Sequence, residues 1–237
     1  MKKFEDILAD FYAISDEHYR VFNERIANIP GGSSIGVRIP QLRTYAKKLV
    51  QEEDFSIEEL FHFPHDIYEI RLLKCLCAGY RKVLFSERVS WIRYIVGIMD
   101  GWSVCDVFCS TLRIPIAEKR SFLQKIEYYI RQKKEFTQRF AYVCLLGNYM
   151  EREYLDFITS ALDRAEAQFY YAHMGAAWLL CEVLVRFYEE GVKYIQNGNL
   201  ALGTKNKAIQ KAGESYRLSN KKKNFLSLIS AVISVEV

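Results

Sequence analysis

Residues 99–112, MDGWSVCDVFCSTL, place a tryptophan and a carboxylate at a spacing that could support chemistry. Trp102 and Asp106 are four residues apart, about one turn of a helix, so both side chains are expected on one face. A carboxylate buried without a partner is costly. Asp106 is therefore expected either to cap or pair with a structural partner, or to face a cleft in which a negative charge has a use.

The segment that carries these residues is one of five similar helical segments. They open at Tyr68, Trp102, Thr137, Tyr171 and Asn206, which are 34 or 35 residues apart. This period is typical of helical solenoids, and segments with helical apolar spacing, such as residues 85–99, lie between the five. The tetratricopeptide signature is absent. The sequence therefore predicts an all-α, HEAT-like superhelix, an α-solenoid in which one helix of each pair lines a concave face.

Composition supports one large helical domain over residues 1–237. Half of the residues are apolar, and there are only four prolines and 12 glycines. The N-terminal segment lacks the apolar core of a secretory signal, and no uncharged apolar stretch approaches the roughly 18 residues of a membrane span. We expect a soluble, cytoplasmic protein with no membrane partner. The net charge of +4 is a weak indication of an anionic partner.

The cysteines lie inside apolar helical stretches, which is typical of reduced core residues. Cys105 and Cys109 are one turn apart and could share a zinc ion, but no further pair with zinc-finger spacing accompanies them. We expect no metal site, no disulfide and no cofactor. The six positions are Cys75, Cys77, Cys105, Cys109, Cys144 and Cys181.

Comparing the five segments by position shows that Asp106 breaks the pattern of the repeat. The equivalent residues are Leu72, Ala141, Gly175 and Gln210. Departures from a local pattern are often functional or strained sites. Basic residues near the helix ends either form a stripe along the concave face or are ordinary solvated side chains. They are Arg38, Arg43, Lys47, Lys48, Arg139, Lys205, Lys207 and Lys211.

Five segments in order carry a resemblance: GVRIPQLRTYAKKL (36–49), GWSVCD (101–106), TQRFAYVCLL (137–146), YYAHMGAAW (170–178) and NKAIQKAGESYRLS (206–219). Together they resemble the HEAT-like-repeat DNA alkylation repair proteins, the AlkD family of alkylpurine DNA glycosylases, in a short branch. The resemblance implies a catalytic aspartate at Asp106, lesion-flanking tryptophans at Trp102 and Trp178, and a phosphate-contacting arginine at Arg139. For the N-terminal aromatic of the cleft, Tyr19 and Phe22 are the candidates.

The chemistry fits these residue types. A purine alkylated on a ring nitrogen is a cationic leaving group, so one carboxylate is enough to stabilise the positive charge that grows on the sugar. Indole faces favour cationic atoms, and arginine binds phosphate. We therefore expect a monomer that binds duplex DNA containing alkylated bases and hydrolyses the N-glycosidic bond. The alternatives are a non-catalytic relative that recognises damaged or branched DNA, and a protein–protein scaffold.

Overall fold

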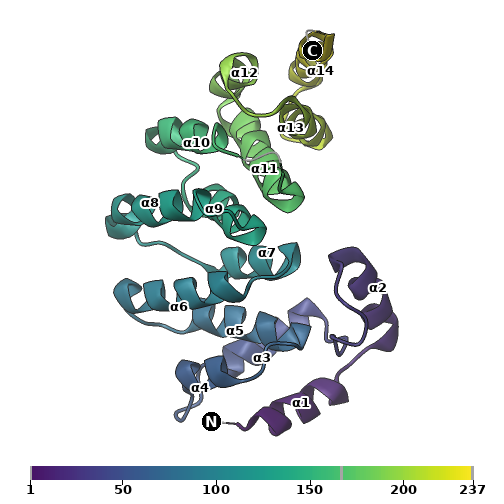
Figure 1. The fold of residues 1–237 in the computed structure, drawn as a ribbon, viewed down its shortest axis with the longest axis vertical. Coiled ribbons are helices and arrows are strands. Elements are labelled where there is room, and N and C mark those ends of the chain that lie inside the picture. The colour runs from purple at the N-terminus through teal and green to yellow at the C-terminus, as the bar shows by residue number, and fades with distance from the viewer. Residues whose placement is uncertain (1, 166–167, 236–237) are drawn as a thin grey trace. The chain divides into compact units, whose positions relative to one another are not determined.

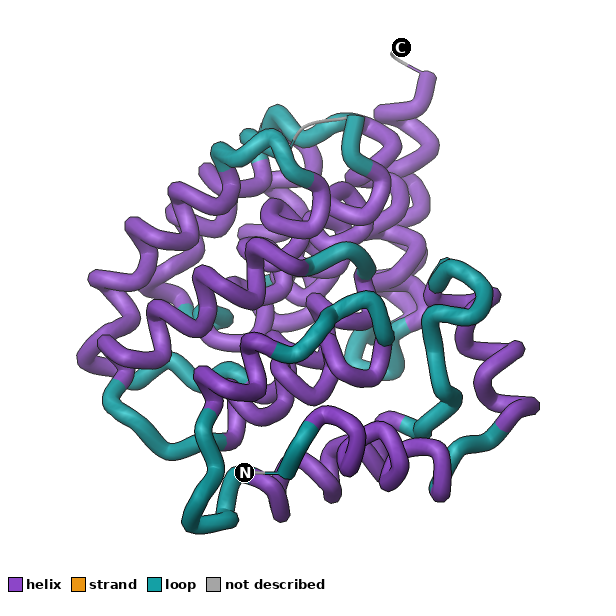
Figure 2. Tube along the Cα trace, turned by 60° about the horizontal axis from the view of Figure 1, so that its bottom comes forward, coloured by secondary structure: helices purple, strands orange, loops and turns teal. Residues whose placement is uncertain are grey.

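The computed structural model describes residues 2–165 and 168–235 (Figure 1). Within these ranges the chain forms fourteen α-helices and one short 3-10 helix, and no β-strand (Figure 2). The predicted all-α fold is confirmed, and it is compatible with a helical-repeat solenoid. Every helix of the described ranges is too short or too polar to span a membrane.

The chain divides into two compact units, Met1–Arg113 and Ile114–Val237. The first contains α1 (Phe4–Ala13), α2 (Glu17–Ala27), α3 (Ile39–Leu49), α4 (Ile57–His62), α5 (Tyr68–Tyr80), α6 (Phe85–Ile98) and α7 (Trp102–Thr111). The second contains α8 (Ile116–Ile130), α9 (Glu135–Asn148), η1 (Arg152–Tyr154), α10 (Leu155–Leu162), α11 (Tyr170–Arg186), α12 (Tyr188–Asn197), α13 (Leu202–Glu214) and α14 (Asn220–Val235).

The five predicted helices are α5, α7, α9, α11 and α13. They begin at residues 68, 102, 135, 170 and 202, so the predicted period holds to within a few residues. A further helix lies between each of them and the next, which gives the expected two helices per repeat. The last helix begins four residues earlier than predicted, because its first turn takes in residues 202–205 ahead of the apolar pattern.

The core of each unit is built from the repeating helices. In the first unit α5 packs between α3 and α7, and nearly all of its residues are buried. The approach of α7 depends on Gly79, since a Cβ atom there would lie 2.0 Å from Thr111 Oγ1. In the second unit α11 packs between α9 and α13. The helices α8, α10 and α12 lie along one side of this row (Figure 1).

All six cysteines are buried, as predicted. Burial is the main cause that raises the pKa of the Cys75 and Cys77 thiols, and it raises the pKa of Cys181 to about 11. Thiols with raised pKa are weak nucleophiles because little thiolate is present at neutral pH. These residues therefore serve as small apolar parts of the core.

Candidate functional site

Trp102 and Asp106 lie one turn apart on α7, on the face that the core leaves accessible. Residues 103–105, 108, 109 and 111 of this helix are buried, whereas Trp102 and Asp106 are half-buried and Ser110 is exposed. These three positions follow one another at intervals of four residues, so they form a single stripe. We call Trp102, Asp106 and Ser110 the α7 stripe.

Arg43 of α3 reaches the end of the α7 stripe. One guanidinium nitrogen of Arg43 donates to Ser110 Oγ at 2.7 Å, and the other donates to the hydroxyl of Tyr80 at 3.0 Å. Arg43 is thus brought one turn beyond Asp106 on the same face of α7. It also links α3 to α5 and α7, so its role in the structure includes holding the α7 stripe in place.

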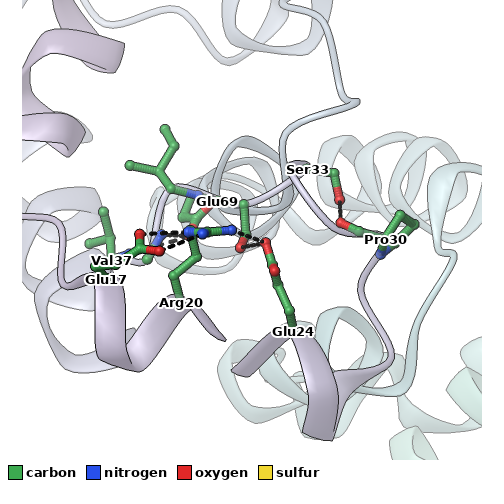
Figure 3. A network of polar contacts seen from close by, with 10 residues as sticks. Glu17, Arg20, Glu24, Pro30, Ser33, Val37 and Glu69 are labelled. Carbon is green, nitrogen blue, oxygen red and sulfur yellow. Dashed lines mark hydrogen bonds and ion pairs between the residues drawn. The ribbon is translucent and has the colours of Figure 1, made fainter. Parts of the chain in front are cut away.

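Helix α2 is attached to the rest of the first unit by a polar network that the sequence reasoning missed (Figure 3). The buried carboxylate of Glu69, on α5, accepts hydrogen bonds from the backbone N–H groups of Ile35, Gly36 and Val37. Glu24 of α2 accepts from Ser34 at 2.8 Å and pairs with Arg20 at 3.0 Å. The loop after α2 is therefore held to α5, and α2 is held to the loop.

The start of α2 is fixed by Asp16. Its carboxylate caps the helix by accepting from the backbone N–H of Tyr19, and it pairs with Arg38 at 2.7 Å. Both interactions lower the pKa of Asp16, the backbone hydrogen bond most strongly. Arg38, predicted to contact DNA, is therefore already paired with a carboxylate.

Of the two aromatic candidates on α2, Phe22 is the more accessible. The guanidinium of Arg38 lies 4.8 Å from the centroid of the half-buried Tyr19 ring, whereas the Phe22 side chain is 54% exposed. Val21 and Ile26 are also exposed on this helix. Helix α2 therefore presents an apolar surface, with Phe22 as its only exposed aromatic residue.

Trp178 lies in the second unit, on α11. Its indole is 38% exposed, whereas the flanking residues 175–177 and 179–180 are buried. Half-buried Met174 precedes it by one turn, so the two lie on the same face of the helix. Trp178 is thus accessible, as a wall of a cleft must be.

Arg139, the predicted phosphate-contacting arginine, is buried. A side chain that only contacts phosphate would not need to be buried. One of its guanidinium nitrogens donates to the carbonyl of Tyr171 at 2.9 Å, which joins α9 to the first turn of α11. Gly175 of α11 lies beside the Arg139 side chain, and a Cβ atom there would be in van der Waals contact with it, 3.4 Å from Arg139 Cγ. Arg139 therefore has a structural role at the same helix that carries Trp178.

The three lysines of α13 differ in their surroundings. Lys205 is buried and donates to the carbonyl of Gly198 at 2.7 Å, and burial lowers its pKa. Lys207 and Lys211 are half-exposed and one turn apart, and Lys207 donates to Gln210 at 2.8 Å. Lys207 and Lys211 are therefore more available to a ligand than Lys205.

The described residues hold no cluster of three or more His, Cys, Asp or Glu side chains that could bind a metal ion. His173 lies in α11, where its Nδ1 atom is hydrogen-bonded to the hydroxyl of Thr204 on α13. This contact ties two repeating helices together, so His173 has a structural role in the packing of α11 against α13.

Fold and site thus define an all-helical repeat protein with an accessible indole and carboxylate on one helix. Comparison with protein families matches residues 7–197 to the DNA alkylation repair enzymes, and the chain belongs to this family. The match spans α1 to α12 and leaves Lys205, Lys207 and Lys211 beyond it. Comparison with individually curated proteins found no match.

Proposed function

We propose that this protein binds duplex DNA along its HEAT-like repeats and hydrolyses the N-glycosidic bond of N-alkylated purines. The observation that carries the proposal is the α7 stripe, in which Asp106 and Trp102 are one turn apart on an accessible face and Arg43 reaches the same face. Membership of a DNA alkylation repair enzyme family supports a damaged-DNA substrate.

The proposed reaction needs one carboxylate and no general acid. An alkylated purine is cationic and leaves as a neutral base, unlike the alkoxide leaving groups for which most glycosidases supply a second carboxyl group. Asp106 would stabilise the positive charge that develops on the deoxyribose as the bond breaks. The indole faces of Trp102 and Trp178 would favour the cationic sugar and base.

Phosphate binding would come from cations with free donor capacity. Arg43 uses two guanidinium nitrogens in the structure, and Arg38 is paired with Asp16, so both would have to share or exchange partners. Lys207 and Lys211 are the more accessible pair on α13. Arg139 would combine a phosphate contact with its hydrogen bond to Tyr171.

The proposal is tested with duplex DNA that contains N7-methylguanine or N3-methyladenine. Released bases are measured by chromatography under single-turnover conditions, and binding is measured by fluorescence anisotropy on methylated and unmodified duplexes. We expect release of methylated bases by the wild type. Binding without release would assign the protein to the non-catalytic class, and the absence of both would favour the scaffold.

A further inference from the structure

Helix α14 has two apolar faces, of which only one is buried. Leu226 and Ile229 pack into the second unit and are nearly inaccessible. Phe225, Leu228 and Val232 form the neighbouring strip of the helix, with exposed fractions of 46%, 66% and 59%. No helix of the described residues covers these three side chains, which we call the α14 outer face.

The spacing of the outer face is that of a helix-packing seam. Phe225, Leu228 and Val232 are separated by three and then four residues, the alternation found at the a and d positions of a coiled coil. Isolated apolar residues on a protein surface need no explanation, but a row at this spacing is typical of a surface that receives another helix.

A groove runs beside this face. It has a volume of about 810 Å³ and lies between the start of α12 and α14. Its lining includes Tyr188 and Glu189 on one side and Lys222, Phe225 and Leu228 on the other. The walls are tied together, because Tyr188 Oη donates to the carbonyl of Lys222 at 3.1 Å and the Lys222 ammonium lies 4.2 Å from the Tyr188 ring centroid.

The charge of the groove is predominantly positive. Lys221, Lys222 and Lys223 are consecutive at the start of α14, and Lys221 precedes Phe225 by one turn on the outer face. Glu189 is the acidic residue of the lining. An occupant that complements this surface must therefore combine an apolar helical face with carboxylates at the end that meets the lysines.

We propose that the groove and the α14 outer face bind an amphipathic, acidic helix of a partner protein. A second copy of the chain fits less well, because three exposed apolar side chains fall far short of the roughly 800 Å² per partner that a stable dimer buries. A single helix that lies in the groove contacts both walls and needs no such area. The α14 outer face lies outside residues 7–197, the segment shared with the family, whereas the α12 wall of the groove, with Tyr188 and Glu189, lies within it.

The test selects binders from a phage-displayed library of 16-residue helical peptides against the full-length protein. The matched control is Ile116→Asp, which replaces an exposed apolar residue at the start of α8 in the same unit. We expect the enriched peptides to carry apolar residues at i, i+3 and i+7 with Asp or Glu at one end. Labelled peptides should bind Leu228→Asp at least 10-fold more weakly than the wild type or Ile116→Asp, and binding should weaken with salt.

Several outcomes would overturn the proposal. One is the absence of enrichment, and another is enrichment of peptides that are basic or that bind Leu228→Asp equally well. A wild-type dimer in sedimentation velocity that Leu228→Asp dissociates would assign the face to a second copy. Co-sedimentation with anionic vesicles that the same variant abolishes would assign it to a lipid surface. Circular dichroism checks folding, and the double variant Phe225→Ser, Val232→Ser repeats the test if Leu228→Asp is misfolded.

Discussion

The buried carboxylate of Glu69 accepts a hydrogen bond from the backbone N–H of Gly36 at 2.8 Å. The same carboxylate accepts hydrogen bonds from the backbone N–H groups of Ile35 and Val37. One side chain of α5 therefore satisfies three consecutive backbone donors. Its position determines where the loop after α2 lies. The placement of Phe22, on the helix before that loop, therefore depends on Glu69.

Glu69→Gln should lower the free energy of unfolding by about 2 to 3 kcal/mol, because the amide offers one acceptor oxygen and turns an NH₂ group toward backbone donors. Urea unfolding monitored by circular dichroism measures the change. The control is Glu53→Gln at an exposed site, which should have an effect within about 0.5 kcal/mol. Equal losses in the two variants would show that the hydrogen bonds to Glu69 contribute little.

Gly36→Ala should destabilise the protein by at least about 2 kcal/mol. Gly36 has a φ of +97°, and a Cβ atom there would lie 2.6 Å from the carbonyl oxygen of Asp16. The control is Gly97→Ala in α6, where a Cβ atom meets nothing within 4 Å and should stabilise the helix by up to about 1 kcal/mol. Opposite signs are expected in thermal unfolding, and a stable Gly36→Ala would contradict the conformation of this loop.

Asp106→Asn should reduce excision of methylated purines by on the order of 10²–10³-fold, as the loss of one electrostatic stabilising group does. Affinity for duplex DNA should be unchanged or higher, because the variant removes a negative charge near phosphates. Single-turnover rates and anisotropy separate the two quantities. A stability loss of about 1 to 5 kcal/mol with no specific effect on the rate would instead make Asp106 a structural residue.

Lys205→Met and Lys211→Met should have different effects on DNA binding. Lys211→Met should lower the dependence of log Kd on log salt by about 0.9 if Lys211 contacts one phosphate. Lys205→Met should leave that slope unchanged, because the ammonium of Lys205 is buried against the carbonyl of Gly198. Titrations at several salt concentrations give both slopes. Equal reductions would mean that Lys205 leaves its buried position when DNA binds.

Lowering the pH should weaken the contribution of Asp16 to the stability of the folded protein. Its pKa is lowered in the folded protein by the N–H of Tyr19 and then by Arg38, so its stabilising effect is present above the unfolded pKa near 4. That effect is lost as the pH falls through the lower folded value. Asp16→Asn should therefore lower Tm at pH 7, and the difference from the wild type should narrow toward pH 3. A gap that stays constant with pH would exclude this linkage.

The repeating helices could be predicted because their apolar residues recur at helical spacing and the segments recur at 34 or 35 residues. The burial of Arg139 and Lys205 could not be predicted, because each side chain is hydrogen-bonded to a carbonyl group that only the fold brings close. The carbonyl of Tyr171, on another helix, accepts from Arg139, and that of Gly198, in the preceding loop, accepts from Lys205. A basic residue at a helix end gives no local signal of such a partner. Long-range contacts of this kind decide whether a cation is structural or available.

The hydrogen bonds of Glu69 could also not be predicted from the sequence. Glu69 follows Tyr68 at the start of an apolar helix, where an acidic residue is ordinary. Its partners are backbone N–H groups more than 30 residues earlier, and backbone groups carry no residue-specific signature. The available signal was Gly36, since a glycine between Ile35 and Val37 in an extended apolar segment suggests a special backbone conformation or a close approach.

Helix α11 packs against both α9 and α13, so it cannot open without disrupting the contacts of either neighbour. Its backbone amides should exchange with deuterium more slowly than those of any other helix in the second unit, and α14 should exchange faster because its outer face is uncovered. Local opening of the second unit would then begin at α14, at the edge of the unit. It would reach α11, the helix that carries Trp178, last. The indole would keep its place while the surrounding repeats fluctuate.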